Sequence, residues 1–289
     1  MALSEDTKKI SYLAEVLKSL PEAMNALSAS HGHKPVQGAP GLLDIQMADD
    51  TDLGSDVLAH SQYLLGVAGD HMEALRRSVG DRTLAYSPFS IARSAFELTA
   101  TSSWITKSDI DLKERFARNL TLLLINSDEQ IKLINASGYK DEEELQEGLE
   151  QPKERREELE SIAAKIGIEP KPNKSGKTLS FVDGDTSVTG RIESTFGRSI
   201  YYRLVSTGAH QPLSMLGALN RAATPIEGFS EMLPDFEKIY WVIGRTVDWY
   251  AKAWWERWLL MGWPTAEVSE QFELAYDTLR LNESERHWR

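Results

Sequence analysis

The sequence contains no cysteine, which excludes disulfide bonds and thiolate metal sites. It also lacks any run of about 18 apolar residues, the length that a membrane-spanning helix requires. The first residues are polar and contain no apolar signal core, so we expect a cytoplasmic protein with no membrane partner. Hydrophobic residues make up 41% of the 289 positions, which is typical of an ordinary globular chain with a real core.

Positive charge is scarce as well. The chain has 32 Lys and Arg against 44 Asp and Glu, a net charge of −12. Residues 140–160 alone hold ten acids and four bases. A protein that coats nucleic acid gains affinity from clustered Lys and Arg, which release counterions from the phosphates. The charge balance therefore argues against a broad nucleic-acid surface, while a small pocket for one nucleotide stays compatible with it.

Several motifs of metal and nucleophile enzymes are absent. The chain has no Glu-x-x-His pair of the di-iron bundles, no His-Glu-x-x-His zinc motif and no Gly-x-Ser-x-Gly elbow. His31 and His33 are close in sequence but have no third ligand near them, so we expect both to be solvated. We accordingly expect no metal ion and no other cofactor.

Apolar residues recur with the period of a helix along most of the chain. The segments predicted to be helical are 1–20, 57–79, 87–104, 110–135, 139–166, 192–211, 213–223, 235–261 and 266–281. Strands do not alternate with these helices, and residues 178–188 could form a short hairpin at most. The tryptophans of the segment 235–261 are expected to fill the core. These patterns predict an all-α protein.

The same patterns suggest a division of the chain. Residues 1–51 are expected to form an N-terminal helix and a flexible linker, since residues 28–50 are rich in Gly, Pro, Ser and Asp. Residues 52–289 are expected to form the helical core domain. A charged helical insertion at about 139–190 should be peripheral to that core.

Candidate functional residues gather in the predicted helix 192–211. Tyr202, Ser206 and His210 are spaced four apart, so they form one stripe of a helix. Arg203 and His210 are seven apart, which places them within roughly 20° of each other. Phosphodiester cleavage without a metal ion requires at least one fixed cation and one titratable base that face the same substrate.

Two other functions are compatible with these residues. Arg93 and Glu97 are four apart in a predicted helix and can form an ion pair. Tyr202, Ser206 and His210 could hydrogen-bond to that pair inside a bundle, because buried polar groups require partners. The chain would then be a non-catalytic scaffold or binding module. A pocket that senses a small molecule or nucleotide is the third alternative.

Arg203, the six residues after it and His210 resemble the Arg-x(4–6)-His signature of HEPN domains. These are all-helical bundles found in bacterial toxins, abortive-infection proteins and other defence systems. The likeness includes a helix of the Ala-Arg-Ser-Ala-Phe-Glu type and a later Tyr-Arg-x-x-Ser-x-x-x-His helix. It covers roughly residues 57–126 and 193–223. One departure is Leu204, since catalytic members usually carry a polar residue after the arginine.

The resemblance implies a HEPN-like multi-helix bundle and a metal-independent endoribonuclease, as a toxin or a defence-associated effector. His210 would act as general base on a ribose 2′-hydroxyl or as general acid on the leaving 5′-oxygen. Arg203 would stabilise the charge on the phosphorane, and Tyr202 and Ser206 would orient the phosphate or the imidazole. The resemblance also implies a homodimer, RNA bound at a localised site, and a cognate antitoxin or defence partner.

Overall fold

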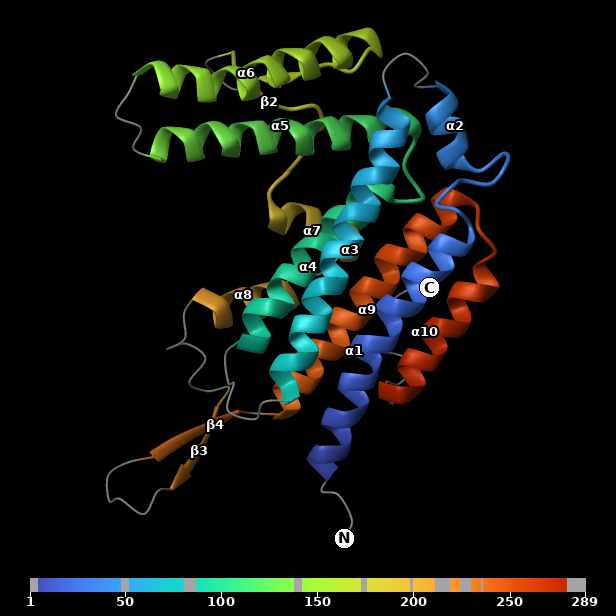
Figure 1. Cartoon of the computed structure of the whole chain (residues 1–289), viewed down its shortest axis with the longest axis vertical. Coiled ribbons are helices and arrows are strands. Elements are labelled where there is room, and N and C mark those ends of the chain that lie inside the picture. Colours follow the sequence, from blue (N-terminus) through green and yellow to red (C-terminus); the bar gives the residue numbers. More distant parts are fainter. Residues whose placement is uncertain are drawn as a thin grey trace.

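The computed structural model describes residues 5–47, 52–80, 87–137, 142–172, 176–197, 200–210, 219–223, 230–234 and 236–279. Helices dominate these ranges (Figure 1), which confirms the all-α class. The helices are α1 (Glu5–Ser30), α2 (Pro40–Met47), α3 (Leu53–Gly80), α4 (Ser87–Thr106), α5 (Leu112–Ala136), α6 (Glu142–Lys165), α7 (Val188–Phe196), α8 (Ile200–His210), α9 (Phe236–Met261) and α10 (Thr265–Leu279). The strands are β1 (Lys171–Pro172), β2 (Thr178–Ser180), β3 (Leu219–Ala223) and β4 (Ser230–Pro234).

Helices α1, α3, α4, α9 and α10 run side by side and form the main bundle (Figure 1). Its core is rich in aromatic side chains. Trp254, Trp258, Tyr250, Phe96 and Phe272 are all fully buried. Large rings of this kind bury more apolar surface than any other side chain, so α9 anchors the bundle. The prediction that its tryptophans fill the core is confirmed for these positions.

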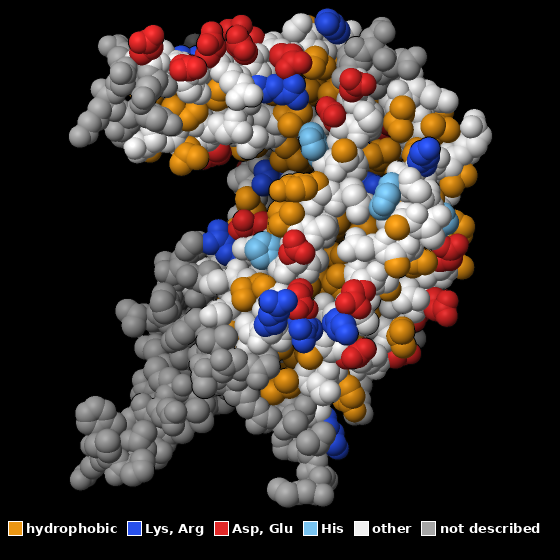
Figure 2. Space-filling model, viewed as in Figure 1, with side chains coloured by type: hydrophobic (Ala, Val, Ile, Leu, Met, Phe, Trp, Pro, Cys, Tyr) orange, Lys and Arg blue, Asp and Glu red, His pale blue; other side chains and the backbone are white. Residues whose placement is uncertain are grey.

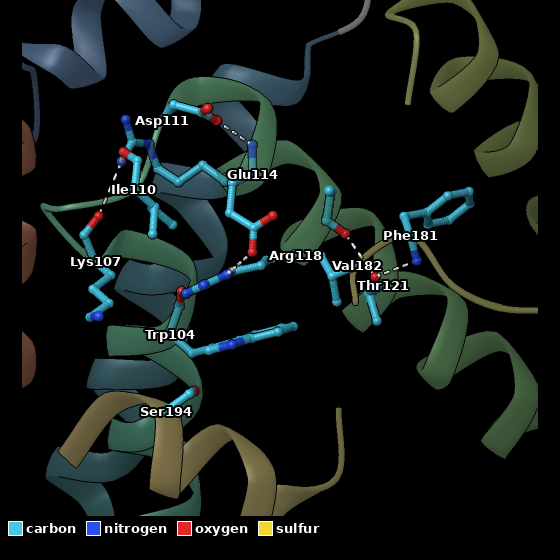
Figure 3. Close-up of polar contacts among 12 residues, drawn as sticks. Trp104, Lys107, Ile110, Asp111, Glu114, Arg118, Thr121, Phe181, Val182 and Ser194 are labelled. Atoms are coloured by element: carbon cyan, nitrogen blue, oxygen red, sulfur yellow. Dashed lines mark hydrogen bonds and ion pairs between the residues drawn. The ribbon is translucent and has the colours of Figure 1, made fainter. Parts of the chain in front are cut away.

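Helices α5 and α6 form an arm that crosses one end of the bundle (Figure 1). The arm has a second hydrophobic core, in which Leu120, Leu124 and Leu159 are fully buried. Figure 3 shows how the β2 segment is attached, because the Thr121 hydroxyl accepts a 2.9 Å hydrogen bond from the Phe181 amide. The charged insertion thus buries one apolar side of α6, while its acidic side faces solvent.

Arg118 fastens the arm to the end of α4 (Figure 3). Its Nη1 donates a 2.8 Å hydrogen bond to the Trp104 carbonyl, and its guanidinium carbon lies 5.1 Å from the centre of the Trp104 ring. Its Nε lies 2.7 Å from Oε1 of Glu114. Asp111 begins α5 by accepting a hydrogen bond from the Glu114 amide. The arm therefore meets the bundle through both polar and ring contacts.

The N-terminal segment differs from the prediction. Helix α1 continues through Pro21 to Ser30, ten residues past the predicted end. Proline removes one helical hydrogen bond, and burial of Met24 in the bundle offsets that loss. Residues 28–50, expected to be a linker, contain the end of α1 and all of α2. Residues 48–51 lie outside the described residues.

The expectation that His31 is solvated is wrong. Its ring stacks on Trp263, with 5.0 Å between centroids and 16° between planes. Its Nε2 lies 2.9 Å from Oε2 of Glu267. Trp263 in turn donates a 2.8 Å hydrogen bond to the Lys34 carbonyl. The turn between α9 and α10 supplies this partner surface from more than 200 residues away, which no local sequence pattern can indicate.

Replacing His31 with alanine is expected to lower the free energy of unfolding by about 1–3 kcal/mol, since one stacked ring pair and one hydrogen bond are lost. Urea denaturation monitored by tryptophan fluorescence measures this change. Lys34→Ala is the matched control, because Lys34 contributes its carbonyl rather than its side chain to this contact. Equal stability of both variants would show that the His31 contacts contribute nothing.

The predicted helix 192–211 is two helices, α7 and α8. Gly197 separates them, because it adopts a φ of +69° and its N–H bonds to the Glu193 carbonyl, which ends α7. Ser187 caps the start of α7 at the Gly190 amide. Apolar residues recur with a helical period on both sides of Gly197, so periodicity alone predicts one continuous helix. The glycine is the one local residue that indicates a helix end.

Two further predictions need correction. Of the segment 213–223, predicted as a helix, residues 213–218 lie outside the described residues and 219–223 form β3, paired antiparallel with β4. The short hairpin expected at 178–188 instead pairs β1 with β2. The partner strand β4 lies outside the segment 213–223, so its pairing with β3 is a contact that the local helical pattern does not indicate. Of the helices described, none is long and apolar enough to cross a membrane.

Candidate functional site

Helix α4 brings the candidate residues together, because α7 and α8 both pack against it (Figure 1). Rings of α7 and α8 also contact α9, where Phe196 stacks on Trp249 and the ring centre of Tyr201 lies 4.8 Å from that of Trp241. Arg93 and Glu97 lie on α4, with Nε of Arg93 2.7 Å from Oε1 of Glu97. The Tyr202 hydroxyl on α8 donates a 2.8 Å hydrogen bond to the same carboxylate oxygen. The predicted ion pair and the predicted contact of Tyr202 with it are both confirmed.

This cluster is partly closed to solvent. The side chains of Arg93 and Glu97 are 25% and 29% exposed, and Tyr202 is buried. Burial raises the pKa of the Tyr202 hydroxyl, and its hydrogen bond to the Glu97 carboxylate raises it further. At neutral pH the phenol therefore stays protonated and acts as a hydrogen-bond donor, which excludes Tyr202 as a general base.

Arg191 on α7 interacts with Glu97 of this cluster through its charge, which the sequence did not indicate. Its Nη1 donates a 2.7 Å hydrogen bond to the Thr186 carbonyl. Burial lowers the pKa of Arg191, while the negative charges of Glu97 and Asp185 oppose that shift. Gly197 breaks the helix between Arg191 and Tyr202, so helical spacing from the stripe could not locate it.

Arg203 takes the opposite orientation from its neighbour Tyr202. Its side chain is 66% exposed, and its Nη2 lies 3.6 Å from Oε1 of the exposed Glu193. Helix α8 thus buries the side that carries Tyr202 and Val205 and opens the side that carries Arg203. The candidate residues of α8 therefore point in two directions, because Tyr202 makes a buried contact and Arg203 faces solvent.

The remaining residues of the stripe are only partly described. Ser206 is half-buried, one turn after Tyr202. His210 is the last residue of α8, and its side chain, like that of Leu204, lies outside the described residues. The backbone of α8 is helical from Ile200 to this position, which keeps position 210 within roughly 20° of Arg203 around the helix. The helical backbone therefore places position 210 on the same side of α8 as position 203.

Replacing Glu97 with alanine is expected to cost about 2–3 kcal/mol of stability, because Arg93 and Tyr202 lose their shared acceptor. Tyr202→Phe removes only one donor and is expected to cost about 1 kcal/mol. Thermal denaturation of both variants beside the wild type measures the difference. A Glu97→Ala change no larger than that of Tyr202→Phe would contradict a shared carboxylate.

Among the described residues, no group of three His, Asp or Glu side chains is arranged to hold a metal ion. The chemistry that these residues offer at α4, α7 and α8 is that of guanidinium, carboxylate and phenol groups. Comparison with known proteins finds no matching family, no matching curated protein and no matching solved structure.

Proposed function

We propose that this chain is a HEPN-like ribonuclease, a toxin or defence-associated effector that cleaves RNA without a metal ion at the exposed side of α8. The orientation of Arg203 is the observation that supports the proposal. Its side chain is 66% exposed, while the adjacent Tyr202 is buried against Glu97. A cation that binds a substrate phosphate must be accessible to solvent. A cation whose only role is an ion pair between two helices does not need to be accessible.

In the proposed reaction, His210 takes the proton from a ribose 2′-hydroxyl, and the oxygen attacks the adjacent phosphorus. The bond from phosphorus to the 5′-oxygen breaks, and that oxygen receives a proton from a protonated imidazole. Arg203 stabilises the negative charge that builds up on the phosphorane. The products are a 2′,3′-cyclic phosphate and a 5′-hydroxyl. In a homodimer, the second His210 would supply the returning proton.

The buried contacts have a positioning role in this proposal. Tyr202 and Glu97 hold α8 against α4, and this contact fixes the direction in which Arg203 projects. A misplacement of about 1 Å is enough to slow a reaction about 100-fold. The half-buried Ser206 lies between Arg203 and His210 in the sequence of α8 and would orient the phosphate.

The purified chain is expected to cleave RNA at an undiminished rate in EDTA and to leave 2′,3′-cyclic phosphate ends, because no step requires a metal ion. Denaturing gels with end-specific labelling measure both the rate and the products. Activity that EDTA abolishes, or products that carry a 5′-phosphate, would contradict the proposed reaction.

A scaffold or binding module is the second candidate. The contact of Tyr202 with Glu97 and the ion pair of Glu97 with Arg93 favour it, because these groups satisfy each other without a ligand. Under this alternative the chain leaves RNA intact, and changes at Glu97 and Tyr202 alter stability alone. An antitoxin or another defence protein would be the partner in either case.

A further inference from the structure

We propose that the arm binds a small zwitterion, a free amino acid with an aliphatic side chain, in a cavity between the start of α5 and the end of α6. The cavity has a volume of about 300 Å³ and is called the arm cavity below. This volume is at the lower end of the range for small-molecule sites, which suits a small ligand. The arm lies away from α8 (Figure 1), so the inference does not depend on the proposed ribonuclease.

Three segments of the arm form the walls of the arm cavity. The first turn of α5 contributes Lys113, residues 167–171 follow α6, and residues 181–183 follow β2. Gly167 turns the chain sharply after α6 with a φ of +70°, a conformation that favours glycine. Nζ of Lys113 lies 3.8 Å from the position that a Cβ atom would take at Gly167. The first two walls are therefore close enough for one small molecule to contact both.

The floor of the arm cavity is apolar. It consists of Ala117, Ile168, Phe181 and Val182, each of which is at most 5% exposed. All four belong to the hydrophobic core of the arm, so packing holds them in place whether or not a ligand is present. Figure 3 shows Phe181 and Val182 beside α5, where the Phe181 amide bonds to Thr121. An aliphatic group can rest on this floor without any rearrangement of the arm.

Most charged groups around the arm cavity are already offset by a partner. Oε1 of Glu114 lies 2.7 Å from Nε of Arg118, and Nζ of Lys171 lies 3.2 Å from Oδ1 of Asp183. Asp111 accepts the hydrogen bond of the Glu114 amide at the N-terminus of α5, where the helix dipole favours a negative charge. These groups therefore add little net charge for a ligand to neutralise.

Lys113 and Glu169 are different. Both line the arm cavity and are exposed, and neither side chain forms an ion pair or a hydrogen bond with another residue in the described part of the chain. A ligand with a single charge is attracted by one of these two groups and repelled by the other. A ligand that carries both charges is attracted by both, so this pair selects for a zwitterion.

A free amino acid carries a group for each of these partners. Its carboxylate is bound by Lys113, its ammonium group by Glu169, and its aliphatic side chain rests beside Ile168. Nucleotides and other phosphates are disfavoured, because Glu169 lines the cavity and acidic side chains gather over α6 (Figure 2). Negative charges of this kind repel a polyanion, whereas an amino acid has no net charge.

Isothermal titration calorimetry of the full chain with leucine, isocaproate and isoamylamine tests the proposal. The three probes share one aliphatic group, but isocaproate lacks the ammonium group and isoamylamine lacks the carboxylate. Leucine is expected to bind about 5- to 20-fold more tightly than either analogue, because each analogue loses one charged contact. Equal affinity for the three probes, or no binding of leucine at millimolar concentration, would overturn the proposal.

Two variants assign the contacts to their residues. Lys113→Met is expected to weaken leucine binding about 5- to 20-fold without weakening that of isoamylamine, which has no carboxylate to lose. Glu169→Gln is expected to weaken leucine binding by a similar factor without weakening that of isocaproate. Lys165→Met is the matched control, since it removes an exposed lysine from the last turn of α6, outside the lining of the cavity.

The pattern across these variants decides the outcome. Both test residues are exposed, so the variants are expected to fold, and circular dichroism checks this. Leucine binding that Lys113→Met and Glu169→Gln leave unchanged, or that Lys165→Met weakens equally, would place the ligand elsewhere and overturn the arm cavity as its site. Neither variant changes a residue of α4 or α8, so RNA cleavage tests the proposed function separately.

Discussion

Arg203→Ala is expected to lower the single-turnover rate of RNA cleavage about 100- to 1,000-fold, the loss that follows removal of one group that stabilises an oxyanion. The change should leave stability nearly unaltered, because the Arg203 side chain is mostly exposed and its contact with Glu193 is a surface ion pair. Quenched-flow measurement with excess enzyme gives the chemical rate. Thermal denaturation of the same preparation shows that the fold is retained.

Two companion variants make this result specific. Arg77→Ala removes a similarly exposed arginine from α3 and is expected to leave the rate unchanged. Arg203→Lys keeps the charge but not the planar pair of donors, and is expected to recover only part of the rate. An Arg203→Ala enzyme with the wild-type rate would remove Arg203 from the proposed reaction.

Asp44→Ala is expected to lower the free energy of unfolding by about 3–5 kcal/mol, which corresponds to a fall in Tm on the order of 10 °C. Oδ2 of Asp44 on α2 lies 2.7 Å from Nε of Arg115 on α5, and the two side chains are 3% and 5% exposed. Arg115 Nη1 also donates to the carbonyls of Lys107 and Ile110. The variant leaves a buried guanidinium without its carboxylate, and calorimetry measures the cost.

The pKa of Asp44 predicts a second feature of this pair. Burial raises that pKa above 3.8, although the hydrogen bond and the charge of Arg115 oppose the shift. A raised pKa in the folded state means that this carboxyl favours folding most at low pH and less as the pH rises through that pKa. The charged pair itself is therefore a weak stabiliser. Replacing both partners, as Asp44→Leu with Arg115→Met, should cost much less than Asp44→Ala.

An additive cost in that double variant would contradict this explanation. If Asp44→Leu and Arg115→Met each destabilised the fold and their combination summed the two losses, the two residues would contribute independently, and neither would depend on the other to satisfy its buried charge. The expected outcome is strong non-additivity, with the double variant more stable than either single one.

The long helices could be predicted from the sequence because their apolar residues repeat over many turns. Helix α4 begins at Ser87, as its Ser-Pro start indicates, and α9 ends at Met261, before Gly262. Long amphipathic segments average out individual exceptions, so the existence of such helices is a robust prediction.

Shorter features depended on single residues and on distant contacts. Gly197 ends α7, yet a glycine is also tolerated inside a helix, so the pattern around it favoured one continuous helix. Pro21 argued for a helix end, and tertiary packing overrode it. The stack of His31 on Trp263 joins residues that only the fold brings together.

The candidate site was predicted in part for the same reasons. Arg93 and Glu97 are four apart on one helix, and their pairing follows from local geometry. The hydrogen bond from Tyr202 to Glu97 was expected as one alternative and required α8 to pack on α4. Arg191 acts on Glu97 from α7 through its charge. The opposite orientations of Tyr202 and Arg203 follow from which side of α8 the bundle covers.

The most direct test of the proposed function compares the wild type with His210→Ala in single-turnover cleavage of single-stranded RNA in EDTA. The account predicts cleavage to 2′,3′-cyclic phosphate ends by the wild type and a rate about 100- to 10,000-fold lower in the variant, because the general base is removed. No cleavage by the wild type, or an equal rate in His210→Ala, would contradict it.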